Sequence, residues 1–256
     1  ELLRSSLANV IRRMLALKLG EVDDFPFLEA PDPRVVADGF RRLTEISAID
    51  EARKLTAIGR TLARLPIDVQ LARMLVEGEQ LHALRELLTI VSFLSIQDPR
   101  ERPSDARQQA DAAHALFADP KSDFAGVLNL WRAYHDAHEE LTQSKLRDWC
   151  SRHFLSFMRM REWRELHRQL LLVVQELGWK LDAQTPSPPS RAMGKRAGGK
   201  GPERGAARVP EVVAPAETDA SRLYESVHRS LLAGLPTQVG RKDEKGASQS
   251  TRERKF

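Results

Sequence analysis

A stretch rich in proline and glycine divides this chain and limits where a packed core can form. Residues 185–215 contain six prolines and five glycines, with no repeating period. Such a composition is typical of a disordered segment, because it buries too little apolar surface to offset the entropy lost on folding. We therefore predict a disordered basic linker over residues 183–220 and expect the main folded part to precede it.

The net charge of +4 is unevenly distributed along the chain. Residues 181–256 hold 14 Lys and Arg against 9 Asp and Glu, whereas residues 1–180 hold 26 against 27. The folded part is therefore close to neutral, and bulk charge alone does not predict a nucleic-acid partner. A single cysteine, Cys150, excludes an intramolecular disulfide and favours a reducing compartment. No apolar run reaches the length of a membrane span, so we expect a cytoplasmic protein with no membrane partner.

The first third of the chain carries the signals of three helices and one hairpin. Asp32 fits the cap of a helix whose first residue is Pro33, where the missing N–H costs nothing. Residues 48–55 fit a short hairpin, and Thr56 fits the cap of a further helix. Helix, helix, hairpin and helix in this order predict a winged-helix domain over residues 1–66.

From Pro66 onward the apolar pattern is helical only. It predicts a mostly α fold, in which a helical bundle over residues 67–182 follows the winged-helix domain. We expect the first of these helices to break near Gly78 and a later one to begin at Ser104. After the linker, residues 221–256 predict one helix, capped by Ser221 and ended by Gly234, and then a polar segment.

Several short motifs have simpler interpretations than a catalytic site. The run from Gly194 to Lys200 matches the spacing of a phosphate loop, but Gly201 stands where Ser or Thr would bind Mg²⁺, so we interpret it as linker. His135 and His138 share a helix face with no third metal ligand, which favours a solvated face over a zinc site. Cys150 is interpreted as a small buried side chain. Nothing in the sequence brings a nucleophile, a base and an orienting group together, which indicates a binding or scaffold module.

The loop after a strongly apolar helix end is the better candidate for binding. It offers Ser95, Gln97, Arg100 and Arg102, and small polar and arginine side chains suit contacts to phosphate and sugar. The alternative is an ordinary charged turn. Arg159 lies in an arginine-rich helical region that also contains Glu162 and Glu165, so pairing along the helix is an equal alternative there.

Longer motifs resemble one protein family in order along the chain. The segments LTAIGRTLARLPIDVQLARMLVEG, LLTIVSFLSIQDPRERP, DFAGVLNLWRAY and WCSRHFLSFMRMREWRELHRQL are similar to the region after the second RecA-like domain of DEAH-box RNA helicases, closest to the bacterial HrpA type. SRLYESVHRSLLAGLPTQVGRKDEKG resembles the lead-in to that family's OB-fold. The sequence departs from the family's pattern at Val69, where the family often has Pro, and at the hairpin turn Glu51–Arg53, which lacks the expected Gly.

The resemblance implies an accessory C-terminal region of an ATP-dependent RNA helicase. It implies a winged-helix domain that couples to the motor and a ratchet-like domain that forms part of the single-stranded RNA channel, with Ser95, Gln97, Arg100, Arg102 and Arg159 at its wall. Partners would be single-stranded RNA, or DNA, and the RecA-like domains of the parent protein. ATP and Mg²⁺ would belong to those domains, since the 256 residues contain neither phosphate loop nor DEAH box. We therefore expect no cofactor and no activity in this region alone.

Two other functions remain compatible with the residues alone. A winged-helix regulator would need a basic helix for the DNA major groove, and residues 33–47 offer only Arg34, Arg41 and Arg42. A helical protein-interaction scaffold is compatible with the neutral folded part.

Overall fold

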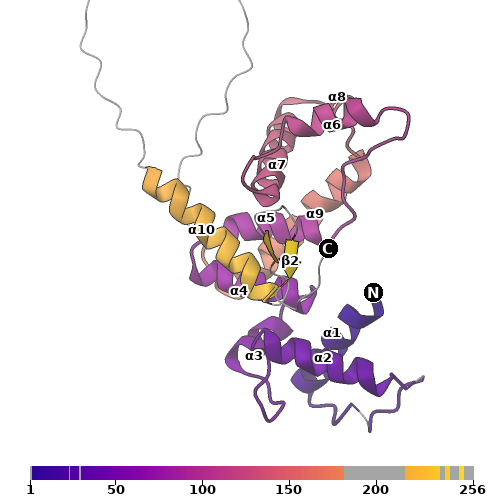
Figure 1. The fold of residues 1–256 in the computed structure, drawn as a ribbon, viewed down its shortest axis with the longest axis vertical. Helices are drawn as coiled ribbons and strands as arrows, with labels where there is room; N and C mark the ends of the chain where they lie inside the picture. The colour runs from indigo at the N-terminus through magenta and orange to yellow at the C-terminus, as the bar shows by residue number, and fades with distance from the viewer. Residues whose placement is uncertain are drawn as a thin grey trace, which may run out of the picture.

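Most of the described chain is helical (Figure 1). The computed structural model describes residues 2–22, 24–28, 30–181, 217–236, 240–242 and 248–250. None of the helices in these ranges is long and apolar enough to cross a membrane. Of the linker predicted over residues 183–220, residues 183–216 lie outside the described residues. The prediction is wrong for residues 217–220, which are helical.

The first three helices form the winged-helix unit predicted from the sequence. They are α1 (Leu2–Leu17), α2 (Pro33–Glu45) and α3 (Ala57–Ala63). The Asp32 side chain accepts a hydrogen bond from Arg34 N, and that of Thr56 accepts one from Gly59 N, so both predicted caps are confirmed. The hairpin is reduced to one antiparallel bridge between Ile49 and Leu55, which joins α2 to α3.

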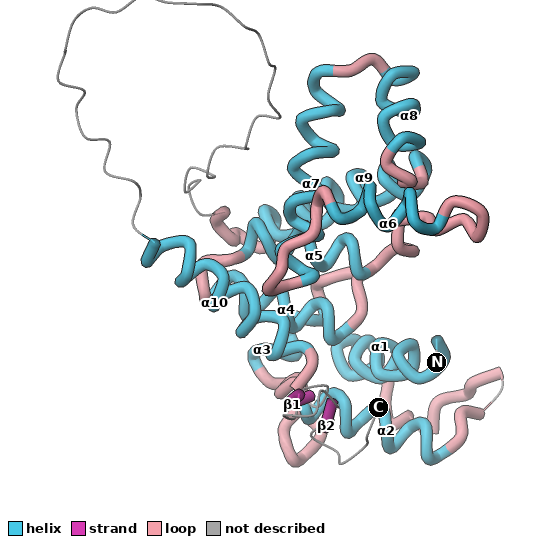
Figure 2. The backbone as a smooth tube through the Cα atoms, turned by 45° about the horizontal axis from the view of Figure 1, so that its top comes forward, coloured by secondary structure: helices cyan, strands magenta, loops and turns pink. Residues whose placement is uncertain are grey.

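Six helices build the second, ratchet-like part. They are α4 (Val69–Gln80), α5 (Leu84–Leu94), α6 (Arg107–Ala115), α7 (Asp123–Glu140), α8 (Gln143–Arg152) and α9 (Phe157–Glu176). The break expected near Gly78 follows Gln80, where α4 ends. The helix start expected at Ser104 is wrong, because α6 has Ala106 at its N-cap. We did not predict α8 as a separate helix. Figure 2 shows α7 and α8 side by side as a hairpin that projects from α5.

Two apolar clusters hold these parts together. The larger one runs from α1 and α2 through α4 and α5 to α9 and α10, so it spans the winged-helix and ratchet-like parts. The smaller one lies between α5, α7, α8 and α9. Trp163 is fully buried in it, with Phe93 and Trp131 against its ring at centroid distances of 5.1 and 4.8 Å. The hairpin of α7 and α8, which we call the outer arm, is therefore anchored on α5 and α9.

Helix α10 (Glu217–Gly234) lies along α4, as both views show. It begins four residues before Ser221, so Ser221 lies within the helix and not at its cap. The predicted end at Gly234 is confirmed. A side chain at Gly234 would collide with the carbonyl oxygen of Gln70 and with Met74, so the absence of Cβ permits the close approach of the two helices. Two short strands, β1 (Gly240–Lys242) and β2 (Ser248–Ser250), pair antiparallel after it.

His167 makes the stability of the outer arm dependent on pH. It packs on Trp131 at a ring distance of 4.7 Å, and burial, with lesser contributions from His135 and Arg85, lowers its pKa to about 4. The folded state therefore favours the neutral ring, whereas the unfolded chain takes up a proton below about pH 6.5. We expect the free energy of unfolding to fall by up to about 2 kcal/mol, after allowance for partial exposure, as pH drops from 6.5 towards 4.

The measurement is urea unfolding at several values of pH in that window. His167→Gln should show a shallower fall than the wild-type protein. An identical fall in the two proteins would contradict this role for His167.

Candidate nucleic-acid interface

The loop that follows α5 is fixed to the turn between α8 and α9. Glu101 N donates to the carbonyl oxygen of Phe154 at 2.8 Å, and Ser156 N donates to that of Pro99 at 2.8 Å. Arg100 and Leu155 form an antiparallel bridge between these two bonds. The loop and the turn thus pair as a short antiparallel ladder, which fixes the backbone from which the loop side chains extend.

The structure places four of the five predicted site residues along this loop. Ser95 is turned back to its own helix, because its hydroxyl donates to the carbonyl oxygen of Val91 at 2.8 Å. Gln97 is exposed. Arg100 binds Asp98 through two of its nitrogens, the shortest contact being 2.7 Å. Arg102 is exposed and pairs with Asp111 of α6 at 2.8 Å.

The fifth residue, Arg159, comes from the first turn of α9 and reaches the same loop. Its guanidinium donates to the carbonyl oxygen of Asp98 at 3.1 Å. The structure thus brings Arg100 and Arg159 together at Asp98, with Arg102 farther along the loop. The pairing that we considered along α9 holds for Arg168, which binds Glu165 at 2.8 Å.

The ion pair between Asp98 and Arg100 compensates much of the charge of the loop. Burial alone would raise the pKa of Asp98, but the hydrogen bonds from Arg100 outweigh it, and the pKa of that carboxyl lies below its ordinary value. The hydrogen bond to Asp98 in turn raises the pKa of Arg100. Both groups are therefore ionised near neutral pH, and a phosphate that binds Arg100 must compete with this carboxylate.

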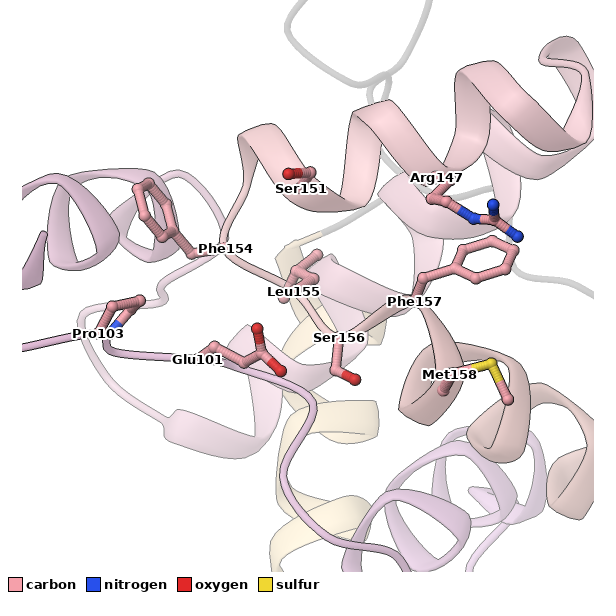
Figure 3. A pocket seen from close by; sticks show the side chains of 9 residues that line it. All are labelled: Glu101, Pro103, Arg147, Ser151, Phe154, Leu155, Ser156, Phe157 and Met158. Carbon is pink, nitrogen blue, oxygen red and sulfur yellow. The ribbon is translucent and has the colours of Figure 1, made fainter.

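An open cleft of about 600 Å³ lies beside the loop (Figure 3). Glu101 and Pro103 of the loop form one side of it, and residues of α8, the turn and α9 form the rest. Arg147 of α8 lies over the ring of Phe157, with the guanidinium carbon 5.1 Å from the ring centroid. Arg161 of α9 lies 5.9 Å from the same centroid.

The remaining sequence candidates are structural or lie elsewhere. Cys150 is fully buried, and burial raises its pKa to about 11, as suits a core side chain. His135 contacts Glu139 at 3.2 Å and His138 contacts Arg164 at 2.6 Å. No group of three or more metal-ligating side chains occurs within the described ranges. The Gly194–Lys200 motif lies outside them and stays a sequence interpretation.

Comparison with known proteins decides the family. Residues 40–67 match the winged-helix part, and residues 68–156 the ratchet-like part, of the helicase-associated domain HA2. The chain carries the helicase-associated domain of DEAH-box RNA helicases. The ATP-dependent RNA helicase HrpA of Escherichia coli is 40% identical over 248 residues, which are 95% of this chain and 16% of that protein. The HrpA homolog of Haemophilus influenzae is 35% identical over 250 residues, again 95% and 16%.

A eukaryotic relative shares part of the same region. The pre-mRNA-splicing factor ATP-dependent RNA helicase prp22 of Schizosaccharomyces pombe is 28% identical over 172 residues, which are 67% of this chain and 14% of that protein. The chain thus spans about a sixth of the length of the curated relatives that it matches.

The candidate interface lies in the ratchet-like part of the helicase-associated domain. The loop from Ser95 to Pro103 is inside the matched residues, and Phe157 follows directly after them. Arg147 and Phe157 are the cleft residues that sequence reasoning did not single out. The i, i+4 spacing of Phe157 and Arg161 on α9 was a usable signal, but the position of Arg147 depends on how α8 packs against α9.

Proposed function

We propose that this helicase-associated domain forms part of the single-stranded RNA channel of a DEAH-box helicase and couples that channel to the motor domains. The observation that supports it most is the backbone ladder between the loop at 95–103 and the turn at 154–157. It gathers exposed polar and arginine side chains on one rigid surface of the ratchet-like part. Contacts from such a surface to the RNA backbone would tolerate any sequence and would weaken with salt.

The motor and its cofactors are expected to lie in other parts of the protein. Within the described residues, no glycine-rich loop stands between a strand and a helix, and no cluster of metal ligands occurs. We propose that ATP and Mg²⁺ bind in the motor domains. Our alternative of a DNA-binding regulator gains no support from α2, where Arg41 is paired with Asp38 at 2.6 Å and contacts Glu45 at 3.8 Å.

The double variant Arg100→Ala with Arg102→Ala in the full-length protein tests the channel surface. We expect the affinity for a single-stranded oligouridylate to fall about three- to tenfold, and RNA stimulation of ATP hydrolysis to weaken with it. Because two phosphate contacts would be lost, the slope of log Kd against log salt should decrease by about 1.4 for a single strand.

Arg132→Ala is the matched control, since Arg132 is an exposed arginine of α7 outside the loop and the cleft. It should leave the affinity within about twofold. Unchanged affinity, salt slope and stimulation in the double variant would exclude this surface as the channel wall.

A further inference from the structure

Two arginines without an ion pair lie at the cleft beside the loop: Arg147 lines it, and Arg161 lies next to its Phe157 wall, while Glu101 lines the loop side. Arg100, Arg102 and Arg168 each bind an acidic side chain, and Arg159 binds a backbone carbonyl. Among the residues that the structure describes, Arg147 and Arg161 form no ion pair, and both side chains are exposed. Both instead lie over the ring of Phe157, with each guanidinium carbon within 6 Å of the ring centroid. Two guanidinium groups without an ion pair thus flank one aromatic ring.

The α8–α9 side of the cleft offers an aromatic ring and a guanidinium, which suit a flat ligand with a negative charge, and the one carboxylate of the lining, that of Glu101, lies on the loop side. In Figure 3, Arg147 and Phe157 lie together at the rim, and the Met158 side chain extends beside them. Met158 is 66% exposed, and the hydroxyl-bearing Ser151 and Ser156 line the wall. Helix α9 begins at Phe157 without a side-chain cap from Ser156, so its first turn adds positive potential to the same opening.

We propose that Arg147, Phe157 and Arg161 form a stacking site for one unpaired nucleobase of single-stranded RNA, and that the two guanidinium groups also bind the flanking phosphates. Unstacked bases bind to aromatic rings and to guanidinium planes, and stacking accepts any base because every base has a π-face. An acidic peptide would satisfy the two cations but would leave the ring and the guanidinium planes without a flat partner. The combination of charge and stacking surface therefore favours the nucleic acid.

This inference rests on the proposed function. It adds two arginines without an ion pair, which the loop lacks. Arg100 must leave Asp98, and Arg102 must leave Asp111, before either can bind a phosphate with its full charge. Arg147 and Arg161 have no such competitor. Because Glu101 and Pro103 belong to both surfaces, a strand that follows the loop would enter the cleft directly.

The test measures the affinity of the full-length protein for two probes. One is an oligouridylate of twelve nucleotides, and the other is an abasic strand of the same length and charge. Phe157→Ala should weaken binding of the oligouridylate about tenfold and binding of the abasic strand less than twofold, because only the former has bases to stack. Phe157→Tyr should retain the wild-type affinity for both. Arg147→Ala with Arg161→Ala should weaken both probes, and Arg132→Ala neither.

The other outcomes count against the stacking site or against the loop. Equal loss of both probes in Phe157→Ala, or no loss of either, would overturn it. A polyglutamate peptide that displaces the oligouridylate at equal charge concentration would also overturn it and would indicate a protein ligand. If Phe157→Ala has no effect while Arg100→Ala with Arg102→Ala weakens binding, the channel surface stands and the stacking site fails. If only Phe157→Ala has an effect, the loop is excluded as the channel wall and the stacking site stands.

Discussion

Replacing Trp163 with alanine is expected to lower the free energy of unfolding by about 3 to 5 kcal/mol, the range for a fully buried large aromatic residue. The indole is completely buried where α9 crosses α5, and the rings of Phe93 and Trp131 pack against it. Its Nε1 donates to the carbonyl oxygen of Thr89 at 3.0 Å and to the hydroxyl of Ser92 at 3.1 Å. Alanine would remove the ring contacts and this donor together, and would leave a cavity.

Urea unfolding followed by circular dichroism measures the effect. Trp163→Phe should cost about 1 to 2 kcal/mol, because it keeps an aromatic ring and loses the N–H group. Met158→Ala is the control on the same helix, since that side chain is 66% exposed and its loss should change stability by less than about 0.5 kcal/mol. A loss below about 1 kcal/mol in Trp163→Ala would mean that the indole does not join α5 to α9.

The second large effect is expected at the junction between the winged-helix and ratchet-like parts. Arg12 of α1 is buried, and its guanidinium donates to the carbonyl oxygen of Leu62 at 2.5 Å and of Leu65 at 3.4 Å. Burial, with the neighbouring Arg13, lowers its pKa, while Asp68 acts in the opposite direction. One turn earlier, Asn9 donates to Asp68 at 3.2 Å, and Asp68 also caps α4. Helix α1 therefore joins the end of α3 to the start of α4.

Arg12→Ala should lower the free energy of unfolding by about 2 to 4 kcal/mol, because buried carbonyl groups lose a charged donor and the arginine stem leaves a cavity. Arg12→Lys should restore only part of it, since an ammonium group is more strongly hydrated than a guanidinium and therefore costs more to bury. Arg13→Ala, at an exposed neighbour on α1, is the control and should stay within about 0.5 kcal/mol of wild type. Equal stability of Arg12→Ala and Arg13→Ala would contradict the role of Arg12.

The parts of the fold that the sequence predicted correctly are those decided by near neighbours. Asp32 with Pro33 and Thr56 mark helix starts through bonds that reach only two or three residues along the chain. The role of Gly78, by contrast, is set by a neighbouring helix. A Cβ there would lie 2.9 Å from Cγ of Leu87, so the glycine allows α5 to pack closely on α4 and does not end the helix.

The candidate site, too, was predictable from the sequence only in part. The loop after α5 was recognisable from its residue types and from the family resemblance, and the structure shows its arginines exposed but paired. Pairing of Arg102 with Asp111 depends on where α6 lies, and the contact of Arg147 with Phe157 depends on how α8 meets α9. Such contacts between separate elements are not encoded in any local pattern.

The most direct measurement of the central claim is photo-crosslinking of a 4-thiouridine oligonucleotide to the full-length protein, followed by mass spectrometry of the linked peptides. Our account predicts crosslinks within residues 95–103 and at the cleft formed by residues 147–161. Crosslinks confined to other parts of the protein, with both of these segments free of RNA, would contradict it.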